Sequence, residues 1–134
     1  MKTFEEIFDL IIEEREKGRI WKGELDFNFD EDGQDDCVFK YADKEIEEFI
    51  KRENIMNIIF EKFKFQIMAR KKALSVKIPI EEHSIILKRI LLQNKIMFNL
   101  QKQLPSYSIS VSINIHEYQY PYNDTYVLEV TVWR

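Results

Sequence analysis

Residues 81–103, EEHSIILKRILLQNKIMFNLQKQ, lie between Pro79 and Pro105 and contain neither Gly nor Pro. An uninterrupted helix needs such a stretch, because proline removes a backbone donor and clashes with the preceding turn. Lys88, Lys95 and Lys102 are seven residues apart, so a helix places them in one narrow stripe. Ten apolar residues occupy much of the remaining circumference. The pattern predicts a central helix that is covered on most sides, with the lysine stripe as its solvated edge.

Composition sets the class of protein around that helix. The chain has 134 residues, of which 45% are hydrophobic and 13% aromatic. This length and composition predict one folded domain over residues 1–134 with a substantial core. We expect a cytoplasmic protein, because the first residues include no apolar leader and no stretch is typical of a membrane span. The single Cys37 has no cysteine partner, which also fits a reducing compartment.

The formal net charge of −4 conceals a strong asymmetry along the chain. Residues 1–54 contain nine Lys or Arg against eighteen Asp or Glu, a net charge of −9. Residues 55–134 contain eleven against six, a net charge of +5. Either each region binds a charged partner, or the two regions face each other inside one fold; the sequence leaves both possibilities open.

Periodicity predicts the remaining elements. Thr3 and Glu6 form a capping box and Gly18 a stop signal, so residues 3–17 should be a helix. Residues 24–30 and 37–41 should form a hairpin with an acidic tip, and residues 42–53 and 55–73 should be helical, as one helix or two. Residues 75–80 should be an extended link or an edge strand, and residues 107–116 and 126–133 a second hairpin.

The expected fold class is therefore α+β. We predict one antiparallel sheet built from the two hairpins, packed on three to four helices around the central helix.

Motifs of catalysis and cofactor binding are missing from the sequence. The three glycines are not spaced for a phosphate loop, and no nucleophile elbow occurs. His83 and His116 belong to no metal-binding pattern. We therefore expect no metal site, no cofactor and no catalytic residues, and an enzyme is the less favoured interpretation.

The composition favours a module that binds another protein. Acidic side chains around the first hairpin would bind a basic surface, and tyrosines near the second hairpin would supply aromatic anchors. Immunity proteins and phage-encoded inhibitors of defence act in this way by occluding a partner. The candidate binding residues are Asp26, Asp30, Glu31, Asp32, Asp35 and Asp36, with Tyr118, Tyr120 and Tyr122.

Two other partners stay open. Basic residues of the helices 55–73 and 81–103 could bind the phosphates of a nucleic acid or nucleotide, although the overall pI of about 5.3 argues against this. The candidate phosphate-binding residues are Lys62, Arg70, Lys71, Lys72, Lys88, Lys95 and Lys102. The opposite charges of the two regions also allow self-association into a homo-oligomer.

Overall fold

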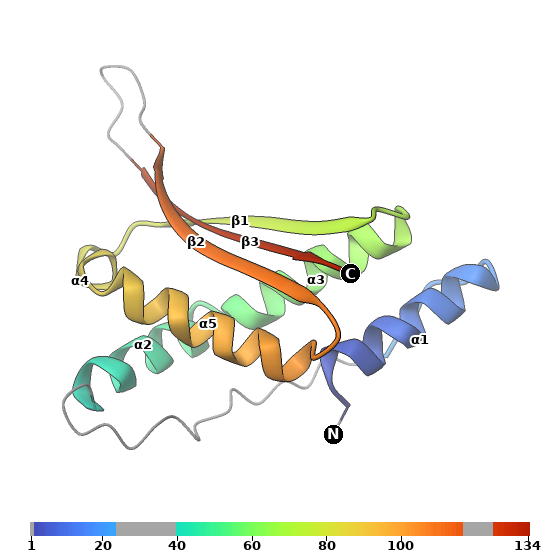
Figure 1. Ribbon diagram of the computed structural model, residues 1–134, viewed down its shortest axis with the longest axis horizontal. Coiled ribbons are helices and arrows are strands. Elements are labelled where there is room, and N and C mark those ends of the chain that lie inside the picture. Colours follow the sequence, from blue (N-terminus) through green and yellow to red (C-terminus); the bar gives the residue numbers. More distant parts are fainter. Residues whose placement is uncertain (1, 24–39, 117–124) are drawn as a thin grey trace.

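The computed structural model describes residues 2–23, 40–116 and 125–134. Within these ranges the chain is α+β, with five helices and a three-stranded antiparallel sheet. Figure 1 shows α2, α3 and α5 on one side of the sheet, with α1 toward the end of the molecule where the C-terminus lies. The α+β class predicted from the sequence is confirmed.

Helix α1 (Phe4–Glu16) begins and ends where its capping residues predict. The Thr3 side chain accepts a hydrogen bond from the Glu6 N–H at 3.2 Å, and Gly18 adopts a left-handed φ of 73° after the helix. Glycine adopts this conformation without strain. The predicted helix is confirmed, and its buried face consists of Phe4, Ile7, Phe8 and Ile11, which recur at helical spacing.

Two helices, not one, occupy the region where the sequence left the number open. They are α2 (Lys40–Arg52) and α3 (Ile55–Met68). Asn54 separates them with a φ of 55°, and asparagine is among the few non-glycine residues that tolerate this conformation. Helix α3 ends at Met68, earlier than the predicted residue 73, because Arg70 also has a positive φ and turns the chain into the first strand.

The central helix predicted over residues 81–103 is interrupted. Helix α4 (His83–Leu87) is followed by α5 (Arg89–Gln103), and Lys88 between them has φ −110° and ψ 25°. Neither Gly nor Pro marks this boundary. The contact found there is tertiary: the Lys88 ammonium pairs with Glu45 on α2.

The sheet has the strand order β1-β3-β2, so the strand latest in the chain lies in the middle. The strands are β1 (Ala73–Ile80), β2 (Ser108–His116) and β3 (Thr125–Trp133), all antiparallel to their neighbours. The predicted C-terminal hairpin and the edge strand ending near Pro79 are confirmed. One face of the sheet carries Leu128, Val130 and Val132, which are fully buried under the helices.

The predicted first hairpin is not part of the described sheet. Residues 24–39 lie outside the described ranges, so the strand at 24–30 and most of the strand at 37–41 stay predictions. The predicted strand is wrong at residues 40 and 41, which belong to α2. The third strand of the described sheet comes from β1, and not from an N-terminal hairpin.

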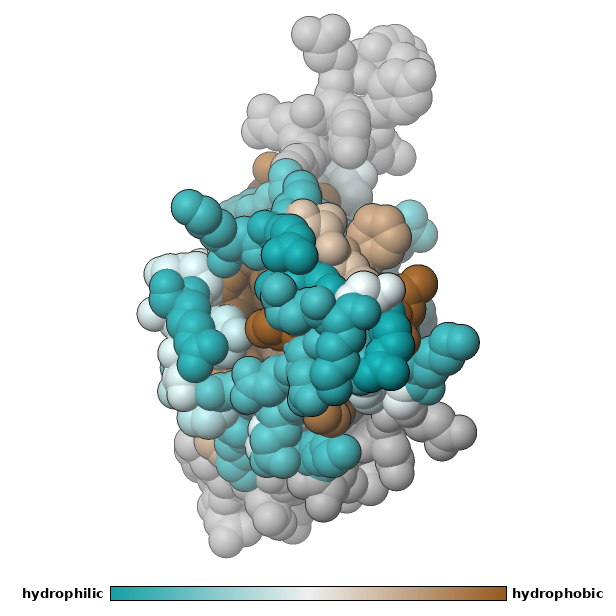
Figure 2. Space-filling view, turned by 90° about the vertical axis from the view of Figure 1, so that its right-hand side faces the viewer, coloured by the Kyte–Doolittle hydropathy of each residue, from teal (hydrophilic) through white to brown (hydrophobic). Residues whose placement is uncertain are grey.

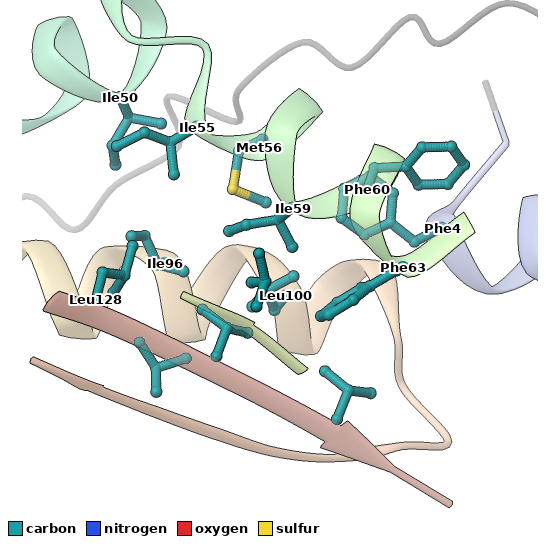
Figure 3. Packing of buried hydrophobic residues seen from close by; sticks show 14 of the residues in the cluster. Phe4, Ile50, Ile55, Met56, Ile59, Phe60, Phe63, Ile96, Leu100 and Leu128 are labelled. Carbon is teal, nitrogen blue, oxygen red and sulfur yellow. The ribbon is translucent and has the colours of Figure 1, made fainter. Parts of the chain in front are cut away.

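The core lies between the sheet and the helices and joins all the main elements (Figure 3). Aromatic rings fill the end near α1: the Phe60 ring lies 5.3 Å from that of Phe4 and 5.6 Å from that of Phe8. These pairs connect α1 to α3 with the offset and tilted geometries that aromatic rings prefer. Ile96 and Leu100 of α5 are fully buried under the sheet.

Polar contacts attach the first turn of α1 to the end of α5. The Gln103 side chain accepts from the Phe4 N–H at 3.1 Å, and the Glu5 carboxylate accepts from the Ser106 N–H at 3.0 Å. Hydrogen bonds from the side chain and the backbone of Ser106 lower the pKa of Glu5. The ionised carboxylate is therefore the form that the folded state favours.

We expect Glu5→Gln to flatten the loss of stability in acid. Because the pKa of Glu5 is lowered by folding, its contribution is present above the pKa of the unfolded state and is lost as the pH falls through the folded value. At neutral pH the substitution should cost less than about 1 kcal/mol, since the group is accessible to solvent. Urea unfolding measured between about pH 3 and pH 7 tests this. Glu61→Gln serves as the exposed control. A loss of unfolding free energy in Glu5→Gln that is the same at the acidic and the neutral end of this pH range would contradict the assignment.

Candidate functional site

The predicted acidic and aromatic binding residues lie outside the described part of the chain. Asp26, Asp30, Glu31, Asp32, Asp35 and Asp36 belong to residues 24–39, and Tyr118, Tyr120 and Tyr122 to residues 117–124. Their roles stay predictions. The seven basic candidates lie within the described ranges, and the structure shows where each of them is placed.

A buried ion pair connects α2 to α5. The Lys95 ammonium lies 2.6 Å from the Glu47 carboxylate, and the two side chains are only 8% and 15% exposed. Asn99, one turn further along α5, is also buried and donates its amide to the Lys95 carbonyl at 2.9 Å. Burying a lysine requires such a partner, because an isolated charge loses its hydration at a high cost in free energy.

Two further pairs bring the acidic and basic regions of the sequence together. Lys88 pairs with Glu45 of α2, and Arg52 at the end of α2 pairs with Glu82 before α4. The Lys88–Glu45 pair offsets the charge asymmetry of the sequence, whereas the Arg52–Glu82 pair joins the minority charge of each region. Lys88 and Lys95, predicted as phosphate-binding candidates, both serve as partners of α2 carboxylates.

The other basic candidates lie on two separate parts of the surface. Lys62, Arg70, Lys71 and Lys72 are exposed along α3 and in the turn that leads to β1. Lys62 contacts the Lys77 carbonyl, and Arg70 lies 3.4 Å from Glu16. Lys102 is near the end of α5, with its ammonium 4.8 Å from the centre of the Phe98 ring.

The polar arc of α5 is directed opposite to the prediction. Of the predicted lysine stripe only Lys102 is exposed, whereas Lys88 is half-buried and Lys95 is buried beside Asn99, so the middle of the stripe is not a solvated edge. The residues exposed instead include Leu87 at 68%, Ile90 at 67% and Phe98 at 37%. The physical reason is the ion pair with Glu47, which turns the polar arc toward α2 and leaves the opposite apolar arc uncovered.

We call this uncovered surface the outer face of α4 and α5. It consists of Leu87, Ile90, Asn94, Phe98 and Gln101, all exposed and all uncharged. By contrast, Figure 2 shows that hydrophilic residues dominate the end of the molecule near α1 and the C-terminus. Contiguous apolar surface is a common property of protein interfaces.

Analysis of the sequence missed this face because it assigned the helix positions by hydrophobicity alone. One signal was available: Asn94 and Gln101 fell among the apolar positions, where buried amides would need partners. Both are exposed in the structure. Their place on the helix therefore marked the arc that faces solvent.

Metal and membrane sites were also sought within the described ranges. Those residues include no group of three or more His, Cys, Asp or Glu side chains arranged to hold a metal ion. None of the described helices is both long enough and apolar enough to cross a membrane.

Comparison of the chain with protein-family models, curated proteins and solved structures finds no match in any of the three. The proposals below therefore rest on the charges, contacts and exposed surfaces of this chain.

We expect Glu47→Leu to destabilise the protein by about 3 kcal/mol, because it leaves the Lys95 ammonium buried without its carboxylate. The double variant Glu47→Leu/Lys95→Met should recover most of that loss, since an apolar pair of similar volume carries no desolvation cost. Denaturant unfolding measures both values. Glu48→Leu, a change at an exposed neighbouring position of α2, is the control. An equal loss in Glu47→Leu and Glu48→Leu would show that the ion pair contributes nothing.

Proposed function

We propose that this chain is a small protein-binding module of the inhibitor or immunity type. In this proposal, the acidic residues of the stretch 24–39 contact a basic surface of the partner and occlude it. The partner's chemistry is that of a nucleic-acid-binding or nuclease surface, whose clustered Lys and Arg attract carboxylates.

One observation carries this proposal: the distribution of charge after the internal pairs are taken into account. Residues 24–39 contain seven Asp or Glu and no Lys or Arg. The rest of the chain contains 20 Lys or Arg and 17 Asp or Glu, a net charge of +3. Carboxylates of α2 that could have added to an acidic surface, Glu45 and Glu47, instead pair with lysines of the same fold. The negative charge of the protein thus resides in one short stretch.

The second part of the proposal concerns the residues near the turn of the C-terminal hairpin. Tyr118, Tyr120 and Tyr122 would supply the apolar contact area that carboxylates alone lack. Charged pairs mainly accelerate association and select the partner, whereas buried aromatic rings slow dissociation.

The proposal is tested by affinity capture from lysate with three forms of the protein at several salt concentrations. The site variant carries Asp30→Asn, Asp32→Asn, Asp35→Asn and Asp36→Asn. The control variant carries Asp9→Asn, Glu48→Gln, Glu61→Gln and Glu81→Gln, four exposed acidic positions outside the stretch. Both variants remove four negative charges, so they differ only in where the charge is lost.

We expect one protein to be enriched by the wild type and by the control variant, and to be lost with the site variant. Added salt should weaken its capture, because exposed charges are screened within about 10 Å at 0.1 M salt. Equal capture by all three forms would contradict the assignment of the acidic stretch, and recovery of nucleic acid alone would favour the second candidate function.

The second candidate is binding of nucleic acid through the basic residues of α3 and the α3–β1 turn. It is favoured by the run Arg70, Lys71 and Lys72, which is exposed in the turn after α3, and by Lys62, which is exposed on α3 itself. Lys88 and Lys95 no longer support it, because they pair with α2.

This candidate predicts that Lys71→Gln/Lys72→Gln weakens binding to a labelled DNA oligonucleotide and lowers its salt dependence. Each lost phosphate contact should reduce the slope of log affinity against log salt by about 0.7 to 0.9. Fluorescence anisotropy measures both quantities, with Lys2→Gln/Lys22→Gln as a control of equal charge. Binding that does not respond to salt, or that is unchanged in the first variant, would exclude this role.

A further inference from the structure

The two edges of the sheet are treated differently by the fold. On β1, the Gln66 side chain of α3 accepts from the Ser75 N–H at 2.7 Å and donates to the Ser75 carbonyl. The Lys62 ammonium contacts the Lys77 carbonyl, and Pro79 has no N–H to offer. Helix α3 thus occupies the outward N–H and C=O of Ser75 and the outward C=O of Lys77, three of the groups of β1 that could pair with another strand.

The contacts of Ser75 also determine which backbone groups of β2 are directed outward. Because Ser75 bonds to Gln66, its N–H and C=O point away from β3. Thr131, opposite Ser75 in the register, then bonds to Ser110 on its other side. Ser110 and its alternate neighbours therefore pair with β3. The backbone N–H and C=O groups that point away from β3, in the plane of the sheet, are those of Ile109, Val111, Ile113 and Ile115.

No hydrogen bond from the described ranges reaches these four outward-directed backbone positions. Between residues 108 and 115 the strand has the sequence SISVSINI, without charge and without proline. Most edge strands carry lysine, proline, a bulge or a covering element that prevents pairing with another chain. In its described surroundings, β2 has none of these.

The outer face of α4 and α5 lies beside this open edge. Helix α5 packs under β2. Helix α3 packs on the same face of the sheet, but under β1 at the opposite edge. In Figure 1, α5 and β2 both lie in front of α3 and β1. The side of α5 turned away from α3 is therefore on the same side of the molecule as the free edge of β2. Lys102, next to Phe98, is at the margin of this surface.

We propose that the β2 edge and the outer face of α4 and α5 form a two-fold interface with a second copy of this chain. Antiparallel pairing of β2 with β2 of the copy joins two three-stranded sheets into one of six strands. Below it, Ile90 and Phe98 of one copy contact the corresponding helix of the other. The proposal does not depend on the protein-binding function proposed above, because it uses different residues.

Charge identifies the occupant as a second copy. A two-fold interface brings each residue near its own equivalent, so any charged residue there would meet a like charge. In a chain in which 33% of residues are charged, β2 from 108 to 115 contains none, and the exposed charged residues of α5, Arg89 and Lys102, lie at helix positions outside the arc of the outer face. Pairing of β2 with itself also places Ile beside Ile on the helix side and Ser beside Ser on the open side.

The test compares Ser110→Lys with Ser75→Lys. Both residues are exposed on the open face of the sheet and both face Thr131, one on the β2 edge and one on the β1 edge. Size-exclusion chromatography with light scattering is measured across a dilution series at low and high salt. We expect the wild type and Ser75→Lys to show twice the 16.3 kDa mass of one chain. Ser110→Lys should raise the dissociation constant about tenfold or more, because it opposes two like charges across the axis.

Amide hydrogen exchange supplies a second readout that does not rely on a charge. In the dimer, the amides of Ile109, Val111, Ile113 and Ile115 should be as protected as those of Ser110 and Ser112. Dilution to the monomer should release only the first set, in strict alternation along the strand. If Ser110→Lys does not fold, Ile115→Pro, which removes one outward N–H, takes its place.

Three results would overturn the proposal. They are a monomer at every concentration, a dimer whose dissociation constant is the same in Ser110→Lys, and a dimer that dissociates in high salt. The last would indicate association through opposite charges. Protection of the four outward amides in a proven monomer would likewise overturn it, by showing that the edge is already covered within one chain.

Discussion

The buried contact between Lys95 and Glu47 constrains the rest of the structure. Burying an ammonium group without a carboxylate nearby is costly, so this pair favours the rotational setting of α5 that directs Lys95 toward Glu47 of α2. In that setting Asn99 is buried as well, and its amide bonds to the backbone of its own helix. The apolar residues on the opposite side of α5 are left at the surface. The Lys95–Glu47 pair thus influences which side chains of α5 are exposed to solvent.

The same constraint separates the charged functions of the chain. Lysines that resemble a phosphate-binding stripe in the sequence neutralise carboxylates of α2, so they contribute little to the surface potential. Negative charge is concentrated in residues 24–39, and exposed positive charge remains along α3 and its turn. The uncharged β2 edge and the outer face of α4 and α5 form a third surface.

Local signals in the sequence predicted the elements that depend on neighbouring residues. Capping by Thr3 and Gly18 defined α1, and the alternation of Ile and Ser defined β2. The sequence did not predict the break at Lys88 or the burial of Lys95, because both depend on carboxylates more than 40 positions away. It also assigned the third strand of the sheet to an N-terminal hairpin. Pairing of β1 with β3 joins distant segments of similar apolar pattern, and nothing local to either segment records that choice.

The position of β3 in the centre of the sheet has a consequence for how the molecule acquires its structure during synthesis. Strands β1 and β2 both pair with β3 and not with each other, and both precede β3 in the chain, so they are synthesised before the strand that joins them. Until residues 125–133 have been synthesised, β1 and β2 lack the strand with which both of them pair. The contacts of α1 and α2 with α3 involve only residues that precede β1 in the chain, so these contacts can form before β3 has been synthesised. The order of the elements in the chain thus allows the helices to pack together before the sheet is complete.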